Sequence, residues 1–266
     1  MRDANALLTP RTRAGAAAPV GRIGSPRSRP RVRPWRAAIA ALALLALAAC
    51  GGGGATEPPV QAQPLVAPGV WVVLGSSTAA GVGASAGQGW ASRLAGQVQP
   101  LGVSLRNLAR AGIQSSQALP VGSVVQPGRP APDPSLNIDR ALAESPRLVL
   151  LAFPTNDAVA GVPAAETVAA WRLKQQRAQA AGVAALVLST LPRAGLGAAQ
   201  HGANVLADAL AAQAFGPCYV PLRAALAGPD GAPAPAYAAG DGVHLNDAGH
   251  RLVHEQVAAV LASGRC

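Results

Sequence analysis

A serine, a histidine and an aspartate occupy positions where they could cooperate in nucleophilic catalysis. Ser77 follows the apolar run Val70–Leu74 and Gly75, a pattern typical of a buried strand that ends in a tight turn. Asp241 precedes His244 by three residues, so its carboxylate can bond one imidazole nitrogen and leave the other free as a general base. Each group also has a structural interpretation, because serines at such turns and an Asp–His pair can cap helices.

Two more polar or flexible residues follow other predicted strands. Gly112 comes after the predicted strand Val103–Leu108, and its backbone N–H is unobstructed by a side chain. Asn156 follows the apolar run Leu148–Phe153, and its amide can donate a hydrogen bond. Taken alone, the first could be an ordinary loop glycine and the second a helix cap. In a parallel sheet, however, the residues beyond the strand ends gather at one edge, where ligands bind.

The elements that must position these residues alternate between short apolar runs and helical patterns. Such alternation predicts βαβ units, and therefore an α/β fold with a parallel sheet covered by helices on both faces. The predicted strands are Val70–Leu74, Val103–Leu108, Leu148–Phe153, Ala184–Thr190 and Cys218–Val220. The predicted helices are Gly89–Val98, Asn137–Glu144, Ala164–Ala181, Ala203–Ala214 and Asn246–Ala262.

Taken together and in this order, the residues resemble the SGNH hydrolases, also called the GDSL esterase/lipase family. The resemblance implies a three-layer sandwich with a flavodoxin-like, five-stranded parallel sheet. It implies that Ser77 is the nucleophile, His244 the general base and Asp241 the residue that orients the imidazole. It also implies an oxyanion hole formed by the N–H groups of Ser77 and Gly112 and the side chain of Asn156. The implied substrate is a small acyl ester, and no cofactor is implied.

The resemblance covers roughly residues 70–262 and includes two departures from the family pattern. The family's Gly-Asp-Ser is here Gly-Ser-Ser, with Ser76 in place of the aspartate. The family's Gly-x-Asn-Asp is here Pro-Thr-Asn-Asp, with Pro154 in place of the glycine. Proline fixes φ and removes an N–H, which a strand end tolerates. Both changes concern loop shape, and none of the matched functional positions is lost.

The first 49 residues have the features of an export signal. Five arginines lie between positions 27 and 36, and a 13-residue apolar stretch, Ala37–Ala49, follows them. The stretch ends in Leu-Ala-Ala-Cys50, which resembles the bacterial lipobox and implies cleavage before a lipid-modified Cys50. Residues 1–49 are therefore predicted to be a lipoprotein signal peptide.

Residues 50–68 are predicted to be the lipid anchor and a flexible linker, because they are rich in Gly, Pro and Ala. The hydrolase domain is predicted to span residues 69–266. Gly51 rather than Asp follows Cys50, which favours the outer membrane in the sorting rule of enteric bacteria. We thus expect an exported protein, anchored to the cell envelope and facing the periplasm.

Lipidation of Cys50 leaves Cys218 and Cys266 as the remaining thiols of the chain. Export makes a disulfide between them possible. The alternative is two free thiols, one in a strand and one at a frayed C-terminus. The sequence leaves both open.

Charge and composition exclude several function classes. The net charge of +10 comes mostly from the first 49 residues, and the rest of the chain is nearly neutral, so nucleic acid is not an expected partner. The pair Gly81-x-Gly83 imitates a dinucleotide fingerprint but lacks the acidic residue about 20 positions later. His250 and His254 have a metal-compatible spacing without an evident third ligand, so no metal is expected.

These observations favour a monomeric serine esterase of short acyl groups. An acyltransferase would use the same residues and cannot be separated from it by sequence. A non-catalytic envelope lipoprotein that keeps the fold for binding is a further alternative. It would not need Ser77, Asn156, Asp241 and His244 together.

Overall fold

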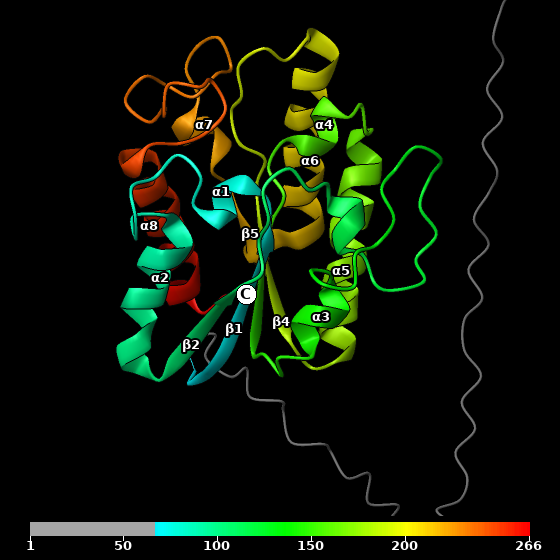
Figure 1. The fold of residues 1–266 in the computed structure, drawn as a ribbon, viewed down its shortest axis with the longest axis vertical. Helices are drawn as coiled ribbons and strands as arrows, with labels where there is room; N and C mark the ends of the chain where they lie inside the picture. Colours follow the sequence, from blue (N-terminus) through cyan, green and yellow to red (C-terminus); the bar gives the residue numbers. More distant parts are fainter. Residues whose placement is uncertain (1–66) are drawn as a thin grey trace, which may run out of the picture. The chain divides into compact units, whose positions relative to one another are not determined.

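The computed structural model describes residues 67–266 (Figure 1). The predicted signal peptide (1–49), the predicted lipid site Cys50 and nearly all of the predicted linker lie outside these residues. The strands are β1 (Gly69–Gly75), β2 (Val103–Asn107), β3 (Leu148–Ala152), β4 (Ala184–Leu188) and β5 (Tyr219–Val220). The α-helices are α1 (Ser77–Ala80), α2 (Trp90–Val98), α3 (Ile138–Leu142), α4 (Asn156–Val159), α5 (Ala164–Ala180), α6 (Ala198–Phe215), α7 (Arg223–Leu226) and α8 (Asp247–Ser263). The 3₁₀ turns are η1 (Gln99–Leu101), η2 (Ser115–Ala118) and η3 (Gly216–Cys218).

The five strands form one parallel sheet in the order β2-β1-β3-β4-β5. This is the flavodoxin-like order, in which the crevice beside the first strand is the usual ligand site. The predicted α/β fold is therefore confirmed. The last residues of β1 and β3, Gly75 and Ala152, are partners in the sheet. The two strands therefore end together, and the residues that follow them lie at one edge.

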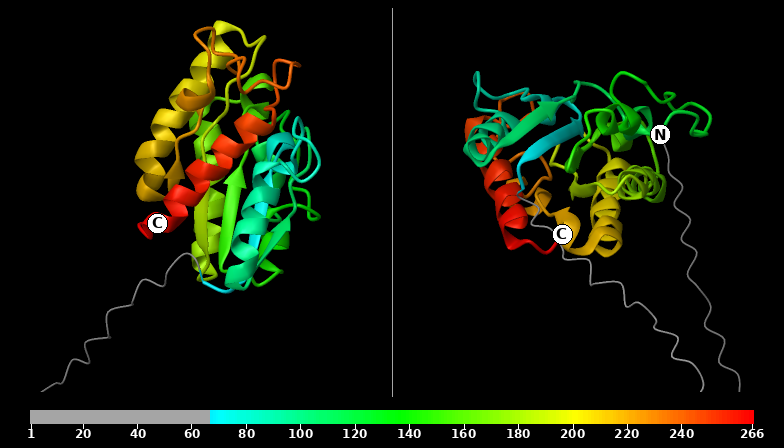
Figure 2. Two further views of the ribbon diagram at one scale, coloured as in Figure 1. Left: turned by 90° about the vertical axis from the view of Figure 1, so that its left-hand side faces the viewer. Right: turned by 90° about the horizontal axis from the view of Figure 1, so that it is seen from below.

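Helices cover both faces of the sheet because alternate strand residues point to opposite sides. On one face α2 and α8 pack over Trp71, Val73 and Leu150. On the other face α3, α5 and α6 pack over Val72 and Leu151. Figure 2 shows α2 and α8 lying together across their side of the sheet. Among the described residues, no helix is long and apolar enough to cross a membrane.

One helix boundary differs from the sequence prediction by more than two residues. Helix α6 begins at Ala198, five residues before the predicted start at Ala203. The first turn contains Gln200 and Gly202 and lacks an apolar face, so periodicity does not reveal it. The Gln200 side chain instead accepts a hydrogen bond from the Gly197 N–H at 3.0 Å and closes the helix end.

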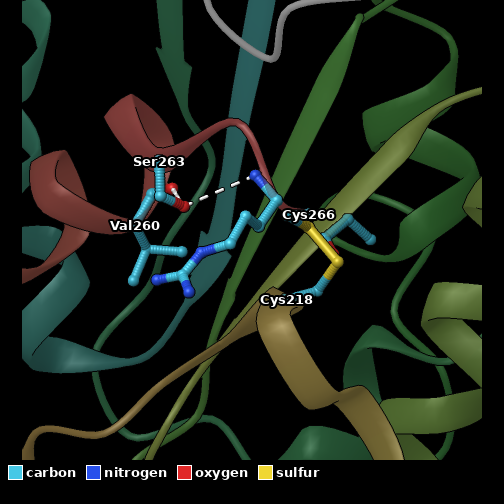
Figure 3. The surroundings of a disulfide bond; sticks show 6 residues. Cys218, Val260, Ser263 and Cys266 are labelled. Carbon is cyan, nitrogen blue, oxygen red and sulfur yellow. Dashed lines mark hydrogen bonds between the residues drawn. A yellow bond between two sulfur atoms is a disulfide. The ribbon is translucent and has the colours of Figure 1, made fainter. Parts of the chain in front are cut away.

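The C-terminal helix is fixed at both of its ends. Asn246 caps its start, as predicted, by accepting hydrogen bonds from the N–H groups of Ala248 and Gly249, each at 3.0 Å. Beyond its last residue, Cys266 forms a disulfide with Cys218, which precedes β5 (Figure 3). The bridge joins α8 to the amino edge of the sheet, opposite the edge where β1 reaches Ser77.

Candidate active site

Ser77 is the first residue of α1 and follows β1 after a single intervening residue. No side chain fits at Gly75, because an added Cβ would lie 2.6 Å from both the Ala152 carbonyl oxygen and Ala79 Cβ. The turn is therefore possible only with glycine there. It places the Ser77 hydroxyl at the carboxyl edge of the sheet, at the N-terminus of a helical turn.

His244 and Asp241 lie on the loop that leads into α8, and the loop brings them to Ser77. The imidazole Nε2 is 3.0 Å from Ser77 Oγ, across 167 positions of sequence. On the other side of the ring, Nδ1 is 2.5 Å from Asp241 Oδ2. With Nδ1–H donated to the carboxylate, the lone pair of Nε2 faces the serine hydroxyl and can accept its proton.

The carboxylate of Asp241 is held in its charged form by its own loop. Its Oδ1 accepts hydrogen bonds from the backbone N–H groups of His244 at 2.8 Å and Val243 at 2.9 Å. These bonds and the one to the His244 ring hold the pKa of Asp241 well below its usual range. Half of its side chain is exposed, so the carboxylate remains hydrated while it orients the ring.

Asn156, the first residue of α4, links the loops that follow β1, β2 and β3. Its Nδ2 donates to Ser76 Oγ at 2.8 Å and to the Ile113 carbonyl at 2.7 Å. Ile113 directly follows Gly112, which has φ +84° and open space where a Cβ would be. Within residues 67–266, the N–H groups of Ser77 and Gly112 donate no hydrogen bond. Two unused backbone donors and the Asn156 amide thus lie on neighbouring loops at the carboxyl edge of the sheet.

The bond to Asn156 explains what Ser76 does in place of the family's aspartate. Its hydroxyl accepts from the Asn156 amide, and its N–H donates to the Ala152 carbonyl at 3.0 Å. A neutral hydroxyl thereby joins the β1 and β3 loops. Sequence reasoning identified the missing carboxylate but not this replacement contact.

A second feature missed from the sequence is the loop that packs behind His244. A Cβ on Gly83 would lie 2.4 Å from the Leu245 carbonyl oxygen and 2.8 Å from His244 Cβ. Gly83, the second glycine of the pair that imitates a dinucleotide motif, therefore permits close approach to the imidazole-bearing loop. His250, fully buried in α8, holds this loop in place. Its Nδ1 accepts from the Trp90 N–H, and its Nε2 donates to the Val82 carbonyl, each at 3.2 Å.

The other histidine on α8 has a partner of its own. His254 Nε2 is 2.6 Å from Gln97 Oε1 on α2. In the described part of the chain, no three His, Cys, Asp or Glu side chains are grouped so that they could hold a metal ion.

Comparison with known proteins identifies the family. The sequence model of the GDSL-like lipase/acylhydrolase family matches residues 73–252, which is most of the chain and includes all five site residues. The chain belongs to this family. It is accordingly an enzyme of the carboxylic ester hydrolase class. Among curated proteins, none is similar enough to count as a relative.

Several solved structures share the fold at low sequence identity. One is a protein from Desulfitobacterium hafniense described as lipolytic, with 16% identity, a TM-score of 0.56, and coverage of 72% of this chain and 98% of its own. A GDSL-like lipase from Bacteroides thetaiotaomicron has 19% identity, a TM-score of 0.54, and coverage of 73% and 88%. A mutant acetyl-xylooligosaccharide esterase from Geobacillus has 14% identity, a TM-score of 0.55, and coverage of 75% and 96%.

Proposed function

We propose that this GDSL-type enzyme is a serine esterase that hydrolyses short acyl esters through an acyl-enzyme on Ser77. The observation that carries the proposal is the continuous contact from Asp241 through His244 to Ser77 Oγ, at 2.5 and 3.0 Å. Such a chain lets a weak nucleophile lose its proton as it attacks.

The proposed reaction has two halves, and in each half His244 takes up one proton and gives it back. Ser77 Oγ bonds to the ester carbonyl carbon while its proton passes to His244 Nε2. The resulting oxyanion accepts hydrogen bonds from the N–H groups of Ser77 and Gly112 and from the Asn156 amide. One amide hydrogen then turns from its present acceptor, Ser76 Oγ or the Ile113 carbonyl, to the oxyanion. The carbonyl reforms, the C–O bond to the alcohol breaks, and His244 gives its proton to the leaving oxygen. Water then attacks the acyl-enzyme by the same route and returns the proton to Ser77.

The chain length of the acyl group is decided by the ester series described below. An acyltransferase would pass the same acyl group to a sugar or another alcohol instead of water.

The test compares purified wild-type protein with Ser77→Ala on chromogenic esters from acetate to octanoate. We expect hydrolysis that is fastest for acetate and absent in the variant. A fluorophosphonate probe should label wild-type protein at Ser77. Labelling at another residue, or none on folded protein, contradicts the proposal. Added alcohols that divert the acyl group from water would identify the transferase.

We also propose that the enzyme is exported, anchored to the outer membrane by a lipid on Cys50, and faces the periplasm. The support comes from the arginine-rich segment, the apolar stretch and the Leu-Ala-Ala-Cys sequence at residues 47–50. Cys50→Ser should release the protein from membranes or leave an unprocessed precursor in cell fractions. A mature, membrane-bound Cys50→Ser variant would overturn the anchor.

A further inference from the structure

The chain contains a single lysine, and its side chain is wholly buried. Lys174 lies on α5 with 0% exposure, its Nζ 4.6 Å from the centre of the Phe153 ring. The Nζ donates to the Ser115 carbonyl at 2.8 Å, and within residues 67–266 no carboxylate lies within ion-pair distance of it. Burial lowers the pKa of Lys174 to about 7. An ammonium is expensive to bury, so stability alone does not account for it.

Ser115 connects this lysine to a buried carboxylate. Its hydroxyl donates to Asp157 Oδ2 at 2.5 Å and its N–H to Oδ1 at 2.9 Å, while its carbonyl accepts from Lys174. Asp157 is 5% exposed, and burial raises its pKa. Ser115 therefore binds both carboxylate oxygens of Asp157, and its carbonyl oxygen accepts the hydrogen bond from Lys174.

Both ends of this chain of contacts adjoin the proposed oxyanion donors. Asp157 directly follows Asn156 on α4. Ser115 lies three residues after Gly112, and the intervening Ile113 carbonyl accepts from the Asn156 amide at 2.7 Å. The contacts thus hold the loop after β2 against the loop after β3 from behind. Oxyanion donors act only when they are positioned within a few tenths of an ångström.

We infer that Lys174 and Asp157 are positioning residues which, through Ser115, set the spacing between Gly112 and Asn156. The inference rests on the proposed function, because it assigns these two residues to the oxyanion hole. Neither Lys174 nor Asp157 touches substrate. Their effect falls on the transition state, in which the oxyanion forms, and not on substrate binding.

The test is a set of variants assayed on a short chromogenic ester, with stability followed by urea unfolding. Lys174→Met removes the bond to Ser115, and we expect kcat to fall roughly 10- to 100-fold with KM within about twofold of wild type. Ala178→Gly is the matched control, because Ala178 is also buried on α5 but is absent from these contacts. It should lose stability while kcat is kept.

The double variant Lys174→Met/Asp157→Asn separates positioning from charge balance. Removing both charges should restore stability relative to Lys174→Met, because no carboxylate is left without its countercharge. Under the positioning role kcat stays low, since the Ser115 carbonyl still lacks its donor. Should Lys174→Met not fold, Ser115→Ala serves instead. It loses only the hydroxyl bond to Asp157, and its kcat should fall several-fold.

Wild-type kcat in Lys174→Met or Ser115→Ala would overturn the inference and leave the esterase proposal standing. Recovery of kcat together with stability in the double variant would also overturn it, since charge balance would then be the whole effect. Failure of the proposed function is distinguishable, because wild-type protein would then show no hydrolysis that depends on Ser77.

Discussion

Replacing Gly83 by alanine should disable the enzyme by displacing the loop that carries His244. Ordinary van der Waals contact begins at 3.4 Å, and the new Cβ would lie 2.4 Å from the Leu245 carbonyl oxygen, so about 1 Å of movement is needed. The φ of +94° adds a cost of about 1–2 kcal/mol for an L-residue. Overpacking adds a further ~1–3 kcal/mol. A shift of about 1 Å at a catalytic group can lower turnover by roughly 10²-fold.

Gly81→Ala is the matched control for this change. Gly81 has nearly the same φ, +92°, but the nearest atom to its added Cβ is 3.9 Å away. Both substitutions place an L-residue at a positive φ and so carry similar backbone strain. Only the Cβ of Gly83→Ala overlaps with the loop that carries His244. The assays are kcat with a short chromogenic ester and urea unfolding of each protein. Equal loss of activity in both variants, or wild-type kcat in Gly83→Ala, would refute the reasoning.

Three more predictions concern the oxyanion hole, the disulfide and the buried histidine. Asn156→Ala should lower kcat by roughly 10²–10³ with little loss of stability; unchanged turnover would mean that other donors bind the oxyanion. Cys266→Ser removes a disulfide between residues 48 positions apart and should lower the free energy of unfolding, measured in urea, by about 4 kcal/mol. The kcat at low temperature should be unchanged. Equal stability of the variant and the wild type would mean that the disulfide does not stabilise the fold. Burial lowers the pKa of His250, so its stabilising contribution is present above the unfolded value of about 6.5 and is lost as pH falls. His250→Gln can keep both hydrogen bonds without titrating, so the stability of this variant should fall less than that of wild type between pH 7 and 5; parallel curves would argue against this role.

The sequence was sufficient for the architecture because the apolar runs and the turn residues agree with each other. Trp71, Trp90 and Trp171 lie within a predicted strand and two predicted helices, and their exposures are 0%, 1% and 1%. The candidate site was predicted from the resemblance to the SGNH hydrolases. That resemblance rests on the order of Ser77, Asn156, Asp241 and His244 and on their places after strands or before the last helix. Parallel topology then brings such residues to one edge without any knowledge of the loops.

What the sequence did not reveal depends on contacts between loops. The bond between Ser76 and Asn156 joins residues 80 positions apart, and no local pattern indicates it. Lys174 offered a signal that was not used, since it shares a helical face with Trp171 and Ala178 at spacings of three and four residues. A lone lysine on that face indicates a buried charge, and a buried charge needs partners.

The polarity of β1 has a consequence for how substrate reaches the enzyme. The strand enters the domain at Gly69, and Ser77 follows eight residues later at the far edge of the sheet, at most roughly 26 Å away. The disulfide fastens the C-terminus at the entry edge as well. An anchored protein would therefore be attached on the side that carries no chemistry. Ser77 would then lie on the side of the domain away from the attachment point, and substrate would reach it without passing the linker.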